Sequence, residues 1–206
     1  FLGHASAEIS PKKLWPAGLA AAGVSLKGKI GPSEQIRPGR AVGRLCDLGW
    51  GSRLRALVTP DAPGGTVPDD MVDAVVEVLK GWAHGEDAWQ RRPAAVVSVG
   101  SHRHPKLVDS LAERIAAVGR LPLLGTLTST HVGGAGPRGN SAQRVLALHD
   151  SFAVPAEMVE SLKDIKGPVL LVDDMADSGW TMVLAGRALR QAGAPDVLPL
   201  ALAVAG

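Results

Sequence analysis

The sequence predicts an α/β fold in which a mostly parallel β-sheet is flanked by helices. Short apolar runs alternate along the chain with segments whose apolar residues recur at helical spacing, as in successive strand–helix units. The run at 168–172 is apolar throughout rather than alternately polar, which is typical of a strand buried on both faces. The 206 residues include no Tyr and only two Phe, so Val, Leu, Ala and Ile must fill the core.

The regular elements of this fold are expected after residue 60. The first helix begins at Pro68 and runs to about Trp82, because two acidic residues follow the proline and Val72, Val75 and Leu79 share one face. Further helices are expected at 106–118, 141–150, 155–162 and 182–192, and strands at 94–99, 121–127, 168–173 and 197–204. Residues 61–206 are therefore predicted to form one α/β domain.

Residues 1–60 are predicted to form an irregular, basic extension or linker. Gly and Pro recur throughout this region, and they interrupt regular structure. Short helices are expected only at 41–46 and 52–57, and a loop is expected at 60–68. The chain begins with Phe1 rather than Met, so we expect it to be a fragment or a processed product.

The charge of the chain is unevenly distributed. Residues 1–60 hold nine Lys and Arg against three Asp and Glu, whereas the whole chain has a net charge of only +2. A basic region of this kind could contact DNA phosphates, in which case binding would weaken with salt. The alternative is that the basic residues dock onto an acidic body, since they are dispersed and no ladder of aromatic residues accompanies them.

Cysteine content and hydropathy restrict the setting of the protein. Cys46 is the single cysteine, which excludes an internal disulfide and a zinc site of several cysteines. A reducing, cytoplasmic setting is expected. No apolar run is long enough to span a bilayer and the first residues lack a signal-peptide pattern, so we expect no membrane partner.

The most informative segment runs from Val169 to Thr181. Its apolar run ends in two adjacent carboxylates, Asp173 and Asp174, which would lie at the C-terminal end of a buried strand. Open α/β sheets bind ligands at this end of their strands. The two carboxylates could accept hydrogen bonds from ribose hydroxyls or hold Mg²⁺.

The loop after the acid pair has the composition of a phosphate site. It contains Asp177, Ser178, Gly179 and Thr181 and leads into a helix, whose first N–H groups favour an anion. Gly179 lets the backbone approach a ligand, and the two hydroxyl groups can donate to phosphate oxygens. The alternative is a buried strand followed by an acidic turn with no ligand.

The segment resembles the phosphoribosyl pyrophosphate signature of the type I phosphoribosyltransferases. This resemblance implies a phosphoribosyltransferase-like fold with Mg²⁺ as the cofactor and phosphoribosyl pyrophosphate or a nucleotide as the ligand. It assigns the ribose hydroxyls to Asp173 and Asp174, which are also the candidate metal ligands, and the 5-phosphate to residues 177–181. It also makes Asp177 the acid that moves a proton to or from the base. Trp180 departs from the family pattern, and its ring is expected either to stack on a ligand or to block the pocket.

A second loop follows the predicted strand at 94–99. In the same family a loop at this point binds pyrophosphate, which would assign Gly100, Ser101 and Arg103 to that group, with Arg103 as a charged partner. His102 and His104 could also bind a metal, because residues two apart in an extended loop point the same way. Two exposed histidines without a metal are the preferred interpretation, since no third ligand is evident.

Glycines recur between Gly133 and Gly139, where the spacing Gly-x-Gly-x-x-Gly occurs. Pro137 lies inside this run and no acidic residue closes the expected strand–helix–strand unit, so a dinucleotide site is not predicted. The segment is interpreted as a loop that either closes over the reacting centre, with Arg138 as a catalytic candidate, or has no function.

Two further resemblances bear on the protein as a whole. The segments 139–144 and 150–154 resemble the ComF group of phosphoribosyltransferase-like proteins, although the cysteine module of that group is absent. The segments 13–18, 26–30, 38–41 and 47–51 resemble the tail of bacterial RecQ-type ATP-dependent DNA helicases. This second resemblance implies a parent protein that unwinds DNA, with a helicase core outside this sequence as a further route to DNA.

Three functions follow from these residues. The chain could be an accessory domain that binds a phosphorylated ribose ligand within a helicase acting in DNA unwinding or repair. It could be an active, Mg²⁺-dependent phosphoribosyltransferase. It could also be a non-catalytic interaction platform with an inactive pocket.

Overall fold

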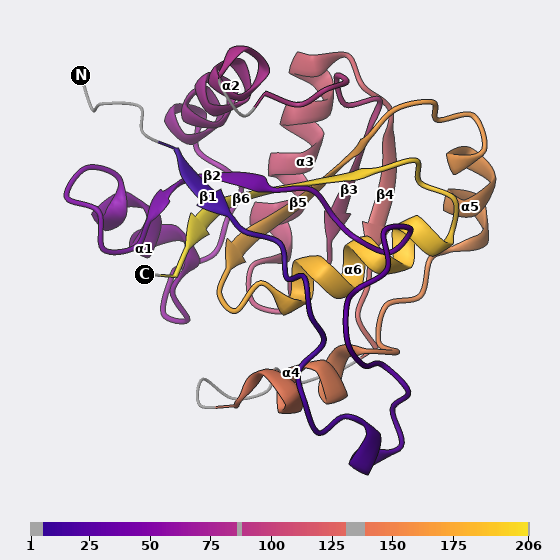
Figure 1. The fold of residues 1–206 in the computed structure, drawn as a ribbon. Helices are drawn as coiled ribbons and strands as arrows, with labels where there is room; N and C mark the ends of the chain where they lie inside the picture. Colours follow the sequence, from indigo (N-terminus) through magenta and orange to yellow (C-terminus); the bar gives the residue numbers. More distant parts are fainter. Residues whose placement is uncertain (1–5, 86–87, 131–138, 206) are drawn as a thin grey trace.

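The protein is built around one six-stranded sheet, as the computed structural model shows for residues 6–85, 88–130 and 139–205 (Figure 1). The strands lie in the order β1-β2-β6-β5-β3-β4. Five of them are parallel, and β1 alone pairs antiparallel, with β2. Their bounds are β1 (Ala7–Ile9), β2 (Gly39–Arg44), β3 (Ala95–Val99), β4 (Leu123–Leu127), β5 (Val169–Ala176) and β6 (Val197–Val204). The predicted α/β class and mostly parallel sheet are confirmed.

Helices cover both faces of the sheet and create two hydrophobic cores. One face packs against α1 (Gly51–Val58), α2 (Asp69–His84) and α3 (Pro105–Gly119). The other packs against α4 (Ser141–Leu148), α5 (Ala156–Leu162) and α6 (Trp180–Gln191). The segment between β1 and β2, with its short 3₁₀ helix η1 (Ala20–Ala22), contributes to the second core. Within the described residues, no helix combines the length and the apolar character needed to cross a membrane.

The direction of the connections reverses between β3 and β5. From β3 the chain passes through α3 to the edge strand β4, whereas from β5 it passes through α6 to β6 on the opposite side. The helices α3 and α6 lie on opposite faces of the sheet. Their paths therefore diverge above the carboxyl ends of β3 and β5, and ligands bind at such a switch point in open α/β sheets.

The first 60 residues are part of this architecture. They supply β1 and β2, and β2 pairs with β6 over Arg40–Arg44. The helix expected at 41–46 is wrong, because Ala41 and Val42 lie in a strand between β1 and β6 and are at most 3% exposed. The helix expected at 52–57 is confirmed as α1. Residues on both sides of position 60 share one sheet and the same two cores.

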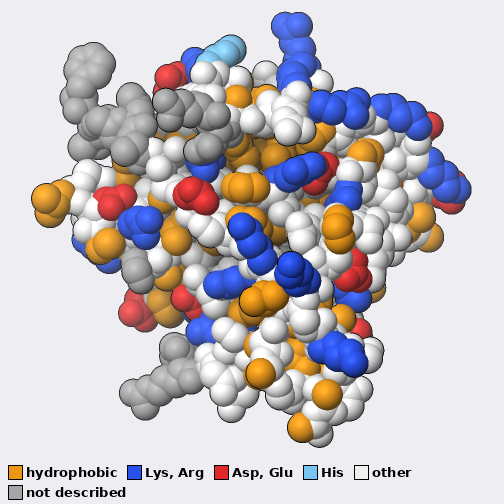
Figure 2. Space-filling model, viewed as in Figure 1, with side chains coloured by type: hydrophobic (Ala, Val, Ile, Leu, Met, Phe, Trp, Pro, Cys, Tyr) orange, Lys and Arg blue, Asp and Glu red, His pale blue; other side chains and the backbone are white. Residues whose placement is uncertain are grey.

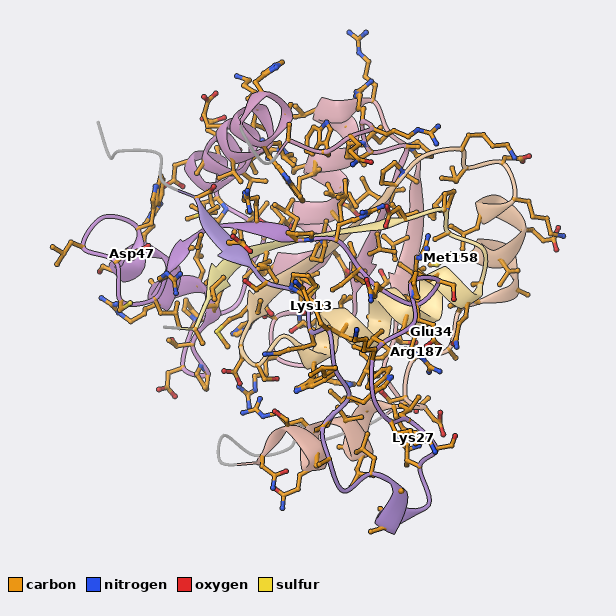
Figure 3. The ribbon with its side chains drawn as sticks, viewed as in Figure 1. Lys13, Lys27, Glu34, Asp47, Met158 and Arg187 are labelled. Carbon is orange, nitrogen blue, oxygen red and sulfur yellow. The ribbon has the colours of Figure 1, made fainter. Side chains whose placement is uncertain are left out.

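Ion pairs and an aromatic stack hold the segment before β2 against the rest of the molecule. Glu34 pairs with Arg187 of α6 at 2.8 Å, and both residues are labelled beside this helix in Figure 3. Arg37 pairs with Asp196 at 2.6 Å just before β6. Trp15 stacks on Trp180 with the ring centroids 6.0 Å apart. Of these contacts, the Arg37–Asp196 pair uses a basic residue of the first 60 within the protein.

Gly186 of α6 marks the closest approach between this segment and the helices. A Cβ atom at this position would overlap Cγ2 of Ile36, a buried side chain that cannot easily move. We predict that Gly186→Ala lowers the free energy of unfolding by about 1–3 kcal/mol, the usual cost of overpacking a core. Urea unfolding monitored by circular dichroism measures the change.

Gly81→Ala in α2 is the matched control for this variant. Nothing lies within 4 Å of a Cβ atom at Gly81, so the gain in helix propensity should stabilise the protein by up to about 1 kcal/mol. Opposite signs are expected for the two Gly→Ala substitutions. Equal stabilisation by both would show that α6 and Ile36 are not packed as described.

Candidate functional site

The carboxyl ends of β3 and β5 bring the two predicted loops side by side. The two strands pair in parallel with Ser98 opposite Val172, so the loop after β3 and the acid pair of β5 lie at the same edge. Residues 169–172 are at most 1% exposed, as expected for a strand between two neighbours. β5 extends to Ala176 and therefore includes Asp173 and Asp174.

Asp173 lies at the boundary between the core and the loop. It is only 5% exposed, and its Oδ1 accepts a hydrogen bond of 2.8 Å from the backbone N–H of Asp174. Burial raises the pKa of the Asp173 carboxyl well above its usual range, and the neighbouring charge and side-chain hydrogen bond of Asp174 raise this pKa further. The backbone N–H donor acts in the opposite direction. The environment therefore favours the protonated form of Asp173.

Asp174 is held by the loop after β3. Its Oδ2 atom lies 2.9 Å from Nδ1 of His104 and accepts a hydrogen bond of 3.3 Å from Oγ of Ser101. His104 is the residue just before α3, and its other ring nitrogen lies 3.1 Å from the carbonyl oxygen of Thr59, which follows α1. The structure thus brings together Asp173, Asp174 and Ser101 from the predicted site.

His104 is the functional candidate that sequence reasoning placed wrongly. Two exposed histidines were the preferred expectation, and His102 is indeed exposed, whereas His104 is only 4% exposed. The two ring nitrogens of His104 lie against Asp174 and the carbonyl oxygen of Thr59. The signal available in the sequence was the position of His104 directly before Pro105, where a new helix begins at the end of a buried strand.

The loop after β5 makes a tight turn into α6. Gly179 has φ 79°, in the left-handed region that glycine adopts without strain, and it is the residue directly before the helix. Ser178 and Thr181 are half-buried, and the Ser178 hydroxyl accepts a hydrogen bond of 3.4 Å from the backbone N–H of Trp180. The side chain of Lys12 passes over this turn, since a Cβ atom on Gly179 would lie 3.7 Å from its Cε.

Asp177 is paired with an arginine that the sequence did not assign to the site. Nη1 of Arg144 lies 2.6 Å from Asp177 Oδ2, and the Arg144 Nε atom donates to the carbonyl oxygen of Gly139 at 3.1 Å. Arg144 belongs to α4, whose start is fixed by a capping box between Asn140 and Gln143. The arginine side chain is 17% exposed and the Asp177 side chain 49% exposed.

Trp180 has a different role from the one expected of its ring. The residue is 2% exposed and stacks on Trp15, so the indole packs the segment before β2 onto α6. Its Nε1 atom is buried and has no hydrogen-bond partner within the described residues. In this arrangement the ring belongs to the hydrophobic core on the α6 side of the sheet, where it packs on Trp15.

The remaining predicted residues are less constrained. The N–H group of Gly100 donates to the carbonyl oxygen of Leu127 at 2.7 Å, so it is already used between β3 and β4. This N–H group is therefore not free to bind pyrophosphate, the group to which the family resemblance assigns Gly100. Arg103 is exposed at the same loop. Arg138 and most of the glycine-rich segment lie outside the described residues.

The carboxylates fit Mg²⁺ only in part. Within residues 6–85, 88–130 and 139–205 there is no group of three or more His, Cys, Asp or Glu residues that could hold a metal. Mg²⁺ is often held by one or two carboxylates together with ligand phosphates and water. Asp173 and Asp174 are a donor set of that size, so a phosphorylated ligand would have to complete the coordination.

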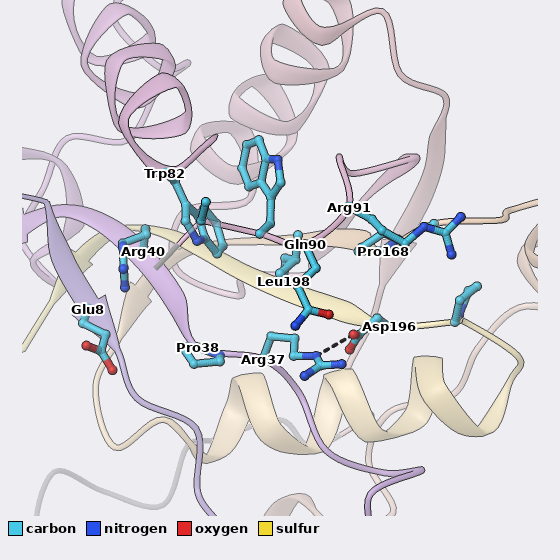
Figure 4. Close-up of a pocket in the computed structure, with 14 residues that line it drawn as sticks. Glu8, Arg37, Pro38, Arg40, Trp82, Gln90, Arg91, Pro168, Asp196 and Leu198 are labelled. Carbon is cyan, nitrogen blue, oxygen red and sulfur yellow. Dashed lines mark hydrogen bonds and ion pairs between the residues drawn. The ribbon is translucent and has the colours of Figure 1, made fainter. Parts of the chain in front are cut away.

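A separate cavity of about 490 Å³ opens at the amino ends of the strands, opposite the acid pair (Figure 4). It lies between the indoles of Trp82 and Trp89 and the Arg37–Asp196 ion pair. None of the predicted site residues lines this cavity. The candidate site is therefore the open carboxyl edge of the sheet and not this cavity.

Comparisons with known proteins add little to this geometry. No protein-family model matches the chain, and no curated protein is similar to it in sequence. Among solved structures, the purine phosphoribosyltransferase from Pyrococcus horikoshii Ot3 is similar to it, with a TM-score of 0.38 and 16% sequence identity over 68% of this chain and 77% of that chain. A likeness of this size leaves the ligand and the activity to be argued from the residues themselves.

The buried Asp173 carboxyl predicts a stability that depends on pH. An unfolded Asp loses its proton near pH 4, whereas the folded protein retains the proton at Asp173 to a higher pH because its pKa is raised. The unfolded state then binds fewer protons, so stability falls as pH rises from about 4 through the raised pKa, by about 1.4 kcal/mol per pH unit within that window. Asp173→Asn should remove this slope.

Urea unfolding of the wild type and of Asp173→Asn between about pH 4 and pH 8 measures the effect. The stability of the variant relative to the wild type should increase with pH. Asp164→Asn, at an exposed aspartate, is the control and should follow the wild type. Parallel curves for all three proteins would contradict the buried environment assigned to Asp173.

Proposed function

We propose that this chain binds a phosphorylated ribose ligand, phosphoribosyl pyrophosphate or a nucleotide, at the carboxyl edge between β3 and β5. The observation that carries the proposal is that Asp173 and Asp174 lie at the topological switch point, directly before the Gly179 turn that opens α6. Carboxylates can accept hydrogen bonds from ribose hydroxyls, and a glycine turn at the start of a helix offers N–H groups to a phosphate.

Each part of the ligand has a matching set of residues in this proposal. Asp174, with Asp173 behind it, receives the ribose hydroxyls, and the turn from Asp177 to Thr181 holds the 5-phosphate. Lys12 adds a positive charge beside that turn. Ser101 and Arg103 face the pyrophosphate. Asp173 and Asp174 would hold Mg²⁺, whose positive charge would offset the negative charge of the phosphate groups.

The accessory role in a RecQ-type helicase extends this proposal through the sequence resemblance. In it, ligand binding at the β5 edge would adjust an activity located elsewhere in the parent protein, in DNA unwinding or repair. An active transferase is the alternative, in which Asp177 moves the base proton and Arg138 contributes to closure. That alternative requires Asp177 to exchange its Arg144 partner for the base, since the pair is 2.6 Å apart. An interaction platform with an inactive pocket is the remaining alternative.

Calorimetric titration with phosphoribosyl pyrophosphate and Mg²⁺ tests the ligand site. The wild type should bind in the micromolar range. Asp173→Asn/Asp174→Asn should weaken binding by about tenfold or more, because a hydrogen bond to a charged group contributes about 1.5–3 kcal/mol. The double variant Glu157→Gln/Asp164→Asn removes two exposed charges on and after α5 and should bind as the wild type does.

Absence of wild-type binding would eliminate the ligand site and favour the interaction platform. Equal binding by the wild type and the Asp173/Asp174 double variant would show that the ligand binds at another place on the protein. If binding is observed and then lost in that variant, incubation with purine and pyrimidine bases separates the transferase from the binding domain, since only the transferase releases pyrophosphate.

A cluster of lysines supports DNA as an additional partner. Lys12, Lys13, Lys27 and Lys29 are exposed, and backbone hydrogen bonds between residues 13–15 and 28–30 hold their segments together. Lys13 and Lys27 are labelled along this part of the chain in Figure 3, and Figure 2 shows basic side chains near the middle of the same face. Such a cluster would neutralise backbone phosphates without reading sequence.

Replacing these four lysines by Gln should flatten the salt dependence of binding to a short DNA duplex. The slope of log K against log salt should fall by about 0.9 for each lysine that contacts a phosphate. Fluorescence anisotropy at several salt concentrations measures it. A variant with Gln at Lys80, Lys106, Lys163 and Lys166 has the same net charge and should retain the slope, whereas equal slopes in both variants would argue against this surface.

A further inference from the structure

The His104 ring links three elements of the fold at the edge of the candidate site. Its side chain is 3% exposed and lies between Asp174 Oδ2 of β5, at 2.9 Å, and the carbonyl oxygen of Thr59 after α1, at 3.1 Å. Its backbone N–H donates to Ser101 Oγ at 2.9 Å. A buried ring with a partner at each nitrogen has a fixed orientation. It can therefore hold the Asp174 carboxylate in one orientation as well.

The partners determine how the ring is used. A carbonyl oxygen only accepts hydrogen bonds, so Nε2 must carry a proton and donate it to Thr59. Nδ1 and Asp174 Oδ2 then share one hydrogen bond, in which either atom can be the donor. Ser101 Oγ approaches the same oxygen at 3.3 Å. Both groups of the β3–α3 loop therefore engage Oδ2, and neither engages Oδ1.

We propose that His104 is a positioning residue for the ligand site: it holds Asp174 by Oδ2 so that Oδ1 is presented to the ribose hydroxyls of the ligand. The inference rests on the proposed function, because it concerns how that site is oriented. The region before residue 60 then contributes to the site, because the carbonyl oxygen of Thr59 holds Nε2 of the His104 ring.

Two amide substitutions separate the two contacts of His104. The amide of Asn reaches about as far as Nδ1 and can donate to Asp174, whereas the amide of Gln reaches about as far as Nε2 and can donate to Thr59. His104→Asn should retain affinity for phosphoribosyl pyrophosphate with Mg²⁺ within about threefold of the wild type. His104→Gln and His104→Ala should lose about tenfold or more. His102→Asn, at the exposed neighbour, should not change affinity.

Urea unfolding of the same proteins distinguishes positioning from general stability. Both His104→Asn and His104→Gln should be less stable than the wild type, since each loses one hydrogen bond of a buried group. Equal affinities of these two variants, alongside binding by the wild type, would overturn the inference and leave the proposed function standing. Absence of binding by the wild type would remove both together.

If the variants do not fold, ¹⁵N NMR of the His104 imidazole in the wild-type protein tests the inference. The ¹⁵N shifts of His104, assigned with the help of His102→Asn, should show a protonated Nε2 with and without ligand. Addition of phosphoribosyl pyrophosphate and Mg²⁺ should move the Nδ1 shift, because Asp174 gains a second partner. An Nδ1 shift that is unchanged at saturation would overturn the inference.

Discussion

The burial of β5 on both faces is the constraint on which the site depends. β5 lies between β3 and β6, and its residues 169–172 are essentially inaccessible, so the polar residues that follow begin inside the protein. An ionised carboxylate in that position is costly unless it gains partners or keeps its proton. The chain uses both solutions in adjacent residues. Asp173 is in an environment that favours its protonated form, and Asp174 is held by His104 and Ser101.

The same constraint explains why the first 60 residues belong to the fold. β6 would be an edge strand without β2, and the face of α6 that begins with Trp180 would be uncovered without Trp15. Gly186 gives Ile36 the room to approach that helix. Thr59 completes the set, since its carbonyl oxygen is the second partner of His104. The basic region thus supports the sheet, the helix after the acid pair and the orientation of one acid.

Local patterns of the sequence predicted the strands and helices after residue 60 well, because continuous apolar runs and helical spacing are properties of neighbouring residues. They failed at β2, where Gly39 and Gly43 weaken a strand whose stability comes from pairing with β6, about 160 residues away. Local patterns also failed to predict which side chains are buried. The burial of His104 depends on Asp174 and Thr59, and that of Trp180 depends on Trp15, and such partners are not encoded by spacing.

The proposed phosphate site requires this acidic edge to accept an anion. Three carboxylates follow one another over five residues, and a phosphate would be repelled if all three were ionised and unpaired. In the fold Asp173 favours its protonated form, Asp174 is held by His104 and Ser101, and Asp177 is paired with Arg144. Lys12 lies beside the turn that follows them. The phosphate site proposed above therefore relies on two positive contributions at this edge, the N-terminus of α6 and Lys12.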